Sequence, residues 1–129
     1  MIVMRNRQTV CIDFDGVILR QGVRWVNAAQ IIGTVMPGAR EAIEGLRQTF
    51  TIIVCSARCA HPGATKAIQS WLNSNGIIVD GVQHEKPHAC AYIDDRAVPF
   101  SGSWPAPLTM VAQLAANERA RTKARRLMN

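Results

Sequence analysis

The chain has 129 residues, 48% of them hydrophobic and 19% charged, which fits one compact domain that buries roughly two-thirds of its unfolded surface and excludes global disorder. Its formal net charge of +6 favours an acidic partner such as phosphate or nucleic acid. Five of the fifteen basic residues fall between Arg119 and Arg126, so the rest of the chain is much closer to neutral.

Apolar runs alternate with segments of helical periodicity from Gln8 onward. The run TVCIDF at 9–14 is short and rich in β-forming residues, which predicts a buried strand. A helix is predicted from Pro37, and its apolar face consists of Ala39, Ala42, Ile43 and Leu46. The run FTIIVC at 50–55 predicts the second strand.

The second half of the chain continues this alternation. A helix is predicted over 62–75, where Gly76 ends it. The runs IIVDGV at 77–82 and ACAYI at 89–93 predict two further strands. A last helix is predicted from Pro107 to about Ala116.

Continuous apolar strands separated by amphipathic helices are typical of a parallel sheet covered on both faces. The sequence therefore predicts an α/β fold, with one domain over 1–116. The basic stretch 117–129 contains helix formers but no clear apolar stripe. It is either a solvated helix extension or a mobile tail.

Two features bear on the compartment. No apolar run approaches the roughly 20 residues of a membrane span, and the apolar stretch before Arg5 and Arg7 is too short for a secretory signal. We therefore expect a cytoplasmic protein that does not associate with membranes. The cysteines lack the dense spacing of a secreted scaffold, so we expect free thiols at Cys11, Cys55, Cys59 and Cys90.

Residues capable of chemistry gather around the ends of the predicted strands, where ligands bind in an open parallel sheet. They are Asp13 and Asp15 after the first strand, Ser56 and Arg58 after the second, and Lys86, Asp94 and Asp95 around the last. Four carboxylates at one edge repel one another unless a divalent cation neutralises them, and oxygen ligands favour Mg²⁺. The hydroxyl of Ser56 and the cations of Arg58 and Lys86 are groups that bind a phosphoryl group.

In this order the residues resemble the four signatures of the haloacid dehalogenase superfamily, which consists mostly of phosphatases on a Rossmann-like sheet. Asp13-Phe14-Asp15-Gly16-Val17 is similar to its DxDx(T/V) segment. Ser56, Lys86 and the pair Asp94-Asp95 are similar to the second, third and fourth signatures. The resemblance runs from about Thr9 to Val98 and implies a three-layer, Rossmann-like domain with a mostly parallel sheet.

The resemblance implies roles for these residues. Asp13 is the nucleophile that forms an aspartyl-phosphate, and Asp15 is the general acid that later activates water. Mg²⁺ is held by the Asp13 carboxylate, the Asp15 carbonyl and the pair Asp94-Asp95, of which Asp95 better matches the direct ligand. Ser56 and Lys86 contact the phosphoryl oxygens. The implied activity is that of a Mg²⁺-dependent phosphomonoester hydrolase.

One departure from many relatives concerns the cap domain. About twenty residues separate Gly16 from Pro37 and roughly thirty separate Ser56 from Lys86, which leaves no room for a sizeable cap. We expect an open site of the kind found in small capless phosphatases of bacteria and phages. Such members accept large substrates or borrow a lid from a neighbouring subunit, so an oligomer is compatible with the sequence.

Three alternatives stay open for the function and its substrate or partner. A small phosphorylated molecule is the favoured substrate. Ser56-x-Arg58 also resembles the phosphatase half of polynucleotide kinase, which brings in a nucleic-acid 3'-phosphate that the basic tail Arg119–Arg126 could attract. The third alternative is a non-catalytic module of the same fold that binds phosphate or nucleic acid.

Simpler interpretations exist for several residues. Ser56 and Arg58 could be a helix cap and a surface cation. Asp94-Asp95 could be an ordinary turn. A zinc site is a weaker alternative, and its candidate ligands are Cys55, Cys59, His61, His84, His88 and Cys90.

Overall fold

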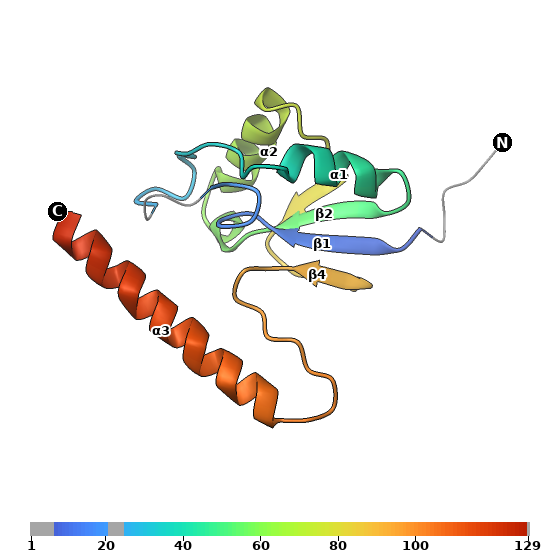
Figure 1. The fold of residues 1–129 in the computed structure, drawn as a ribbon. Helices are drawn as coiled ribbons and strands as arrows, with labels where there is room; N and C mark the ends of the chain where they lie inside the picture. Colours follow the sequence, from blue (N-terminus) through green and yellow to red (C-terminus); the bar gives the residue numbers. More distant parts are fainter. Residues whose placement is uncertain (1–6, 21–24, 129) are drawn as a thin grey trace. The chain divides into compact units, whose positions relative to one another are not determined.

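The computed structural model describes every residue except 1–6, 21–24 and 129. The described residues form a four-stranded parallel sheet and three α-helices (Figure 1). Their contacts divide the chain into two units, Met1–Asp95 and Arg96–Asn129. Each unit is described separately.

The sheet belongs to the first unit, and all its strand pairs are parallel. Its strands are β1 (Thr9–Asp13), β2 (Thr51–Cys55), β3 (Gly81–Gln83) and β4 (Ala91–Ile93). They lie in the order β3-β2-β1-β4. Asp13 is in register with Cys55, so β1 and β2 end at the same level. The predicted α/β fold with a parallel sheet is confirmed.

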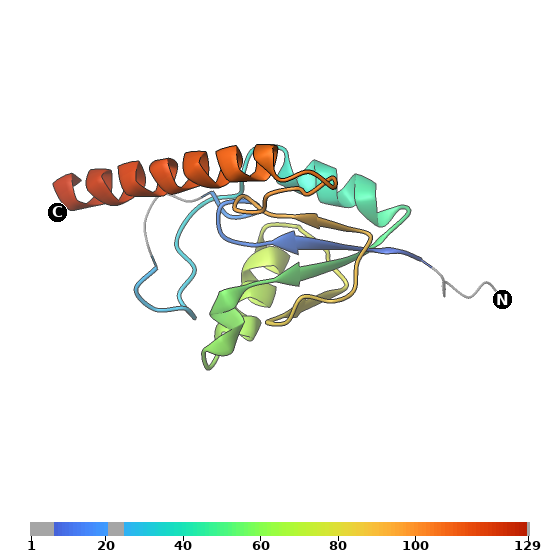
Figure 2. The ribbon, with the colours of Figure 1, turned by 90° about the horizontal axis from the view of Figure 1, so that it is seen from below.

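Two helices cover one face of this sheet. Helix α1 (Ala39–Arg47) follows β1, and α2 (Ala64–Ser74) follows β2 after the short 3-10 helix η1 (Ala57–Ala60). Both crossovers step across the sheet in the same direction, and right-handed crossovers then place both helices on one face (Figures 1 and 2). Their side chains meet alternate strand residues in a core that includes Val10, Ile12, Ile52, Val54, Ile43, Ile68 and Leu72.

The other face of the sheet, within the described part of Met1–Asp95, carries a connecting segment in place of a helix. This segment, 84–90, is fastened by two side chains. The Cys55 thiol donates to the carbonyl of Glu85 at 3.1 Å, and the Tyr92 hydroxyl donates to the carbonyl of Pro87 at 2.7 Å. Helices therefore cover only one face of the sheet in this unit, where the sequence predicts both faces covered.

The strand predicted over 77–82 is wrong for most of its length, because β3 begins only at Gly81. Ile77 is buried in the core without strand pairing. Asp80 makes the hydrogen bonds to Ile52 that a longer strand would otherwise make. Its N–H donates to the Ile52 carbonyl, and its carboxylate accepts from the Ile52 N–H, both at 2.8 Å. Apolar residues before β3 thus serve the core, while a side chain completes the hydrogen bonding of β2.

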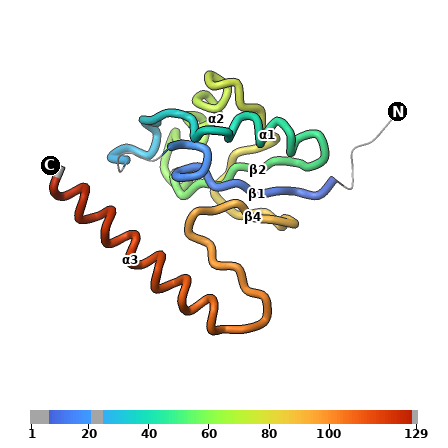
Figure 3. Tube along the Cα trace, viewed as in Figure 1, coloured from blue at the N-terminus to red at the C-terminus, as the bar shows by residue number. Residues whose placement is uncertain are grey.

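Helix α3 (Pro105–Met128) belongs to the second unit and is a continuous helix (Figure 3). The predicted end near Ala116 is wrong, and of the two alternatives for 117–129 the helix extension is the one observed up to Met128. Helix-forming Ala, Arg and Lys residues and a contact of 2.7 Å between Arg121 and Glu118 support this extension. The domain bounds 1–116 and 117–129 themselves stay a prediction.

Among the described residues, no helix has both the length and the apolar character needed to cross a bilayer. The absence of a secretory signal was inferred from residues 1–7, most of which lie outside the described part of the chain. The cytoplasmic location stays a prediction.

Candidate functional site

The chain turns sharply where β1 ends. Gly16 has a positive φ of 82°, which glycine adopts readily. The carbonyl of Phe14 accepts backbone N–H groups from Ile18 at 3.0 Å and Leu19 at 2.9 Å. The Phe14 ring is fully buried against Trp71, with ring centroids 5.3 Å apart. Phe14 is therefore the anchor of the turn, and the aspartates on either side of it remain partly exposed.

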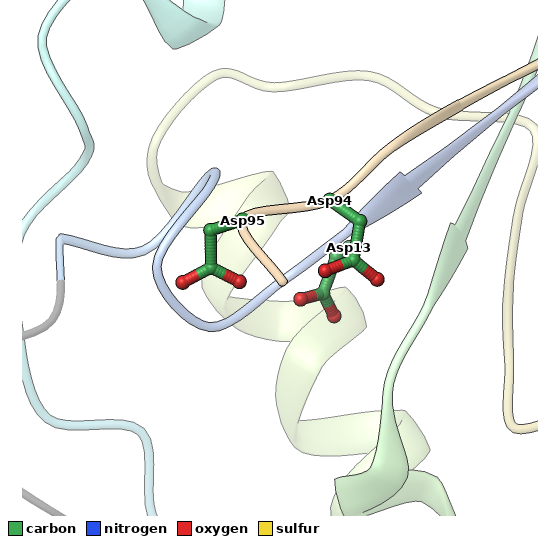
Figure 4. Close-up of side chains that lie close together, drawn as sticks. All are labelled: Asp13, Asp94 and Asp95. Carbon is green, nitrogen blue, oxygen red and sulfur yellow. The ribbon is translucent and has the colours of Figure 1, made fainter. Parts of the chain in front are cut away.

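Three carboxylates meet at the carboxyl ends of β1 and β4 (Figure 4). Because Ile12 is in register with Ile93, the next residues, Asp13 and Asp94, come side by side. Each of Asp13, Asp94 and Asp95 offers an oxygen within 4.8 Å of the others. The structure therefore brings together three of the four predicted metal ligands by their side chains.

The position of Asp13 makes its negative charge unfavourable. Burial raises the pKa of its carboxyl to about 6 from an ordinary 3.8, and the charges of Asp94, Asp95 and Asp15 add to the effect. The N–H of Phe14 donates to Asp13 at 2.9 Å and acts in the opposite direction. A cation between the carboxylates would relieve this repulsion.

The fourth aspartate, Asp15, has a different partner. Arg58 donates from Nε to one Asp15 oxygen at 2.9 Å and from Nη2 to the other at 2.8 Å. The Asp15 carboxylate is thus held in one orientation by a bidentate ion pair. Asp15 is outside the group of carboxylates that approach one another, and its predicted role as a metal ligand through its carbonyl stays a prediction.

Arg58 is buried, with 2% of its side chain exposed, so its interpretation as a surface cation is wrong. Its Nη1 donates to the carbonyls of Ala28 at 3.1 Å and Gln30 at 3.4 Å, and the guanidinium lies 5.1 Å from the Trp25 ring. Arg58 therefore joins η1 to Asp15 and to the segment 25–30. Its predicted contact with phosphate stays a prediction, and sequence reasoning missed these contacts.

Ser56 and Lys86 lie near the same edge of the sheet. Ser56 follows β2 directly, and its hydroxyl oxygen accepts the N–H of Arg58 at 3.1 Å, so the helix-cap interpretation is correct. Lys86 places Nζ 3.7 Å from an oxygen of Asp94, although its side chain is 62% exposed. The short connection between β3 and β4 thus brings Lys86 to the acidic cluster.

The alternative zinc site is not assembled. Among the residues the structure describes, Asp13, Asp94 and Asp95 form the only group of three or more His, Cys, Asp or Glu side chains close enough to share an ion. All four cysteines are free, but the burial expected for such thiols holds only for Cys11 and Cys55, because Cys59 is half-buried and Cys90 is exposed. Burial and a neighbouring thiol, Cys11, raise the pKa of Cys55 to about 12, which makes it a poor metal ligand at neutral pH.

Comparison of the chain with protein-family models, with curated proteins and with solved structures gave no match. The residues and distances above are therefore the basis for the function proposed below.

Proposed function

We propose that the protein is a Mg²⁺-dependent phosphomonoesterase of the haloacid dehalogenase type that works through an aspartyl-phosphate on Asp13. The observation that carries the proposal is the cluster of three carboxylate oxygens within 4.8 Å at the ends of two adjacent parallel strands. The strand order β3-β2-β1-β4 supports the finer proposal of a Rossmann-like fold. Short segments after β1 and β2 support the proposal that it has no cap.

The donor set fits Mg²⁺. Three carboxylate oxygens within 4.8 Å of one another are the kind of donor that Mg²⁺ prefers. Asp13, Asp94 and Asp95 would hold the ion. When bound, it would lower the repulsion between an anionic nucleophile and an anionic substrate.

The first chemical step belongs to Asp13 and Asp15. A carboxylate oxygen of Asp13 attacks phosphorus, so a phosphorus–oxygen bond forms to Asp13 while the bond to the leaving oxygen breaks. Asp15 gives a proton to the leaving oxygen, for which it must first be protonated and give up one of its two hydrogen bonds from Arg58. The other bond keeps the carboxyl group in place.

The second step releases phosphate. Asp15, now a carboxylate, takes a proton from water as the water oxygen attacks phosphorus. The bond between phosphorus and Asp13 breaks, and both aspartates return to their starting states. The two steps together hydrolyse one phosphomonoester and consume one water.

Ser56 and Lys86 are proposed to bind the phosphoryl oxygens. The hydroxyl oxygen of Ser56 is an acceptor for Arg58, and among the described residues its proton has no acceptor, which leaves it for a phosphoryl oxygen. Lys86 supplies a positive charge beside Asp94. These groups orient the substrate and offset its charge.

Hydrolysis of an aryl phosphate, measured with Mg²⁺ and with EDTA, tests the proposal. We expect turnover only with Mg²⁺ and a loss of roughly 10³-fold or more in Asp13→Asn, because the amide cannot act as the nucleophile. Glu44→Gln, the same change on the exposed surface of α1, should keep full activity. Full activity in Asp13→Asn would contradict the mechanism.

Thermal unfolding separates the catalytic proposal from a non-catalytic module. Mg²⁺ should raise the melting temperature of the wild type, and by less in Asp95→Asn, because a ligand stabilises the state that binds it. A Mg²⁺-dependent rise without phosphate release would support the non-catalytic alternative.

A further inference from the structure

The positive charge of the protein is concentrated in its second unit. Arg96–Asn129 contains six Arg and Lys residues and one Glu, a net charge of +5. Met1–Asp95 contains nine Arg and Lys residues and eight Asp and Glu residues, a net charge of +1. Five of the six basic residues of this unit lie at 119–126, so most of the excess charge is separate in sequence from the acidic cluster.

Helix α3 divides its basic residues between two sides. Glu118 contacts Arg121 at 2.7 Å and Arg125 at 3.6 Å, so these two cations share one acidic partner on one side of the helix. Glu118 also contacts Arg96 at 3.7 Å. At about 100° per residue, a second set lies roughly 130° around the helix from the first: Arg119, Lys123 and Arg126. We name these three residues the basic row.

Among the described residues, no ion pair or side-chain hydrogen bond engages Arg119, Lys123 or Arg126, in contrast to Arg121 and Arg125. Their spacing of four and three residues places them along one stripe of the helix. The stripe rises about 10 Å over seven residues. It thus offers three cations in a line to an anionic partner.

We propose that the basic row binds the phosphate backbone of nucleic acid. Three cations over about 10 Å match the rise of about three nucleotides of one strand in a duplex, and contacts between cations and phosphates need no particular base sequence. This inference goes beyond the phosphatase activity and does not depend on it.

The composition around the row disfavours a lipid surface. A helix that lies on a membrane buries an apolar face beside its basic one. Residues 117–126 read NERARTKARR, in which alanine is the only apolar residue type. The exposed large apolar side chains of α3, such as Leu108, Val111 and Leu127, lie outside this stretch. Residues 117–126 therefore carry charge without an apolar face of their own, whereas backbone phosphates in water require charge alone.

Fluorescence anisotropy of a labelled 20-nucleotide DNA, single-stranded and duplex, tests the proposal with the full chain. We expect micromolar binding whose log K falls with log salt concentration at a slope of about −2 to −3, as three phosphate contacts predict. Arg119→Gln/Lys123→Gln should weaken binding roughly tenfold at low salt and make the slope shallower by about 1.5 to 2.

Two variants keep the test specific. Arg40→Gln/Lys66→Gln removes two exposed cations from the first unit and should change the affinity less than twofold. Arg119→Lys/Arg126→Lys keeps the charges and should retain binding within about threefold. Far-UV circular dichroism checks that α3 is intact, since glutamine is a good helix former.

Three results would overturn the proposal. They are an absence of DNA binding by the wild type, an equal loss in the first-unit control, and binding only to vesicles of phosphatidylserine and phosphatidylcholine. Phosphatase activity on an aryl phosphate should be the same in all these variants, so the outcome is independent of the proposed reaction.

Discussion

Asp13, the proposed nucleophile, carries a charge that is unfavourable for the stability of the fold. Its carboxyl is partly buried, lies beside two other carboxylates and is hydrogen-bonded by Phe14. A neutral side chain would suit this position better in the absence of a metal ion. This conflict between charge and burial is typical of reactive groups.

The pH dependence of stability tests this view of Asp13. The folded-state pKa is about 6 and the ordinary value is 3.8, so between these pH values the folded state holds a proton that the unfolded state has lost. The carboxylate therefore lowers the free energy of unfolding progressively as pH rises through this window. Above pH 6 its unfavourable contribution is fully present.

Asp13→Asn removes the titration and keeps an oxygen that can accept from Phe14. In EDTA, the variant should match the wild type near pH 4 and be more stable by about 1 kcal/mol at pH 8, a value reduced for partial exposure to water. Urea unfolding at several pH values measures the difference. A difference that stays constant with pH would contradict the prediction.

Arg58 acts on the scale of elements, because it ties η1 to the turn after β1 and to the segment 25–30. Arg58→Ala should lower the free energy of unfolding by about 3–5 kcal/mol, since it leaves a partly buried carboxylate and two carbonyls without donors. Arg58→Lys keeps the charge but cannot form the bidentate pair, so its effect should be intermediate.

Urea unfolding at neutral pH measures both variants, and Arg40→Ala on the surface of α1 is the control, with an expected change within about 0.5 kcal/mol. If Arg58→Ala were no more destabilising than this control, the ion pair would not hold these segments together.

Much of the first unit could be predicted from local pattern. Strands β1 and β2 and helices α1 and α2 were within reach because their apolar periodicity and stop signals, such as Gly76 with φ 70°, are local. Strand β3 was misplaced because Ile77 serves the core without pairing and the Asp80 side chain replaces a strand contact. The periodicity of apolar residues does not distinguish a residue that packs in the core from one that also pairs in a strand.

The candidate site was predictable in part for the same reason. Parallel strands end at one edge, so Asp13 and Asp94 had to meet once β1 and β4 were neighbours. The burial of Arg58 and its contacts were not predictable, because part of its hydrogen bonding comes from the carbonyls of Ala28 and Gln30, which lie in an irregular segment. Contacts of this kind produce no regular spacing of residues by which they could be recognised in the sequence.

At the scale of the whole molecule, the two proposed functions belong to different parts of the chain. The acidic cluster lies in Met1–Asp95, and the basic row lies in Arg96–Asn129. Residues 96–104 between β4 and α3 form no helix or strand. Few contacts cross such a boundary, and proteases cut at such segments first.

Limited proteolysis with chymotrypsin tests this division. The first cut should follow Phe100, whose side chain is 56% exposed outside regular structure, whereas Trp104 is protected because Pro105 follows it. By contrast, Phe14 is fully buried, and Trp71 lies within α2 against it. Mass spectrometry should then show an early fragment that ends at Phe100 and that persists, because helices and parallel strands protect the backbone of the first unit. Early cutting within 9–83 would show instead that the first unit opens as readily as the connection, and would contradict the division.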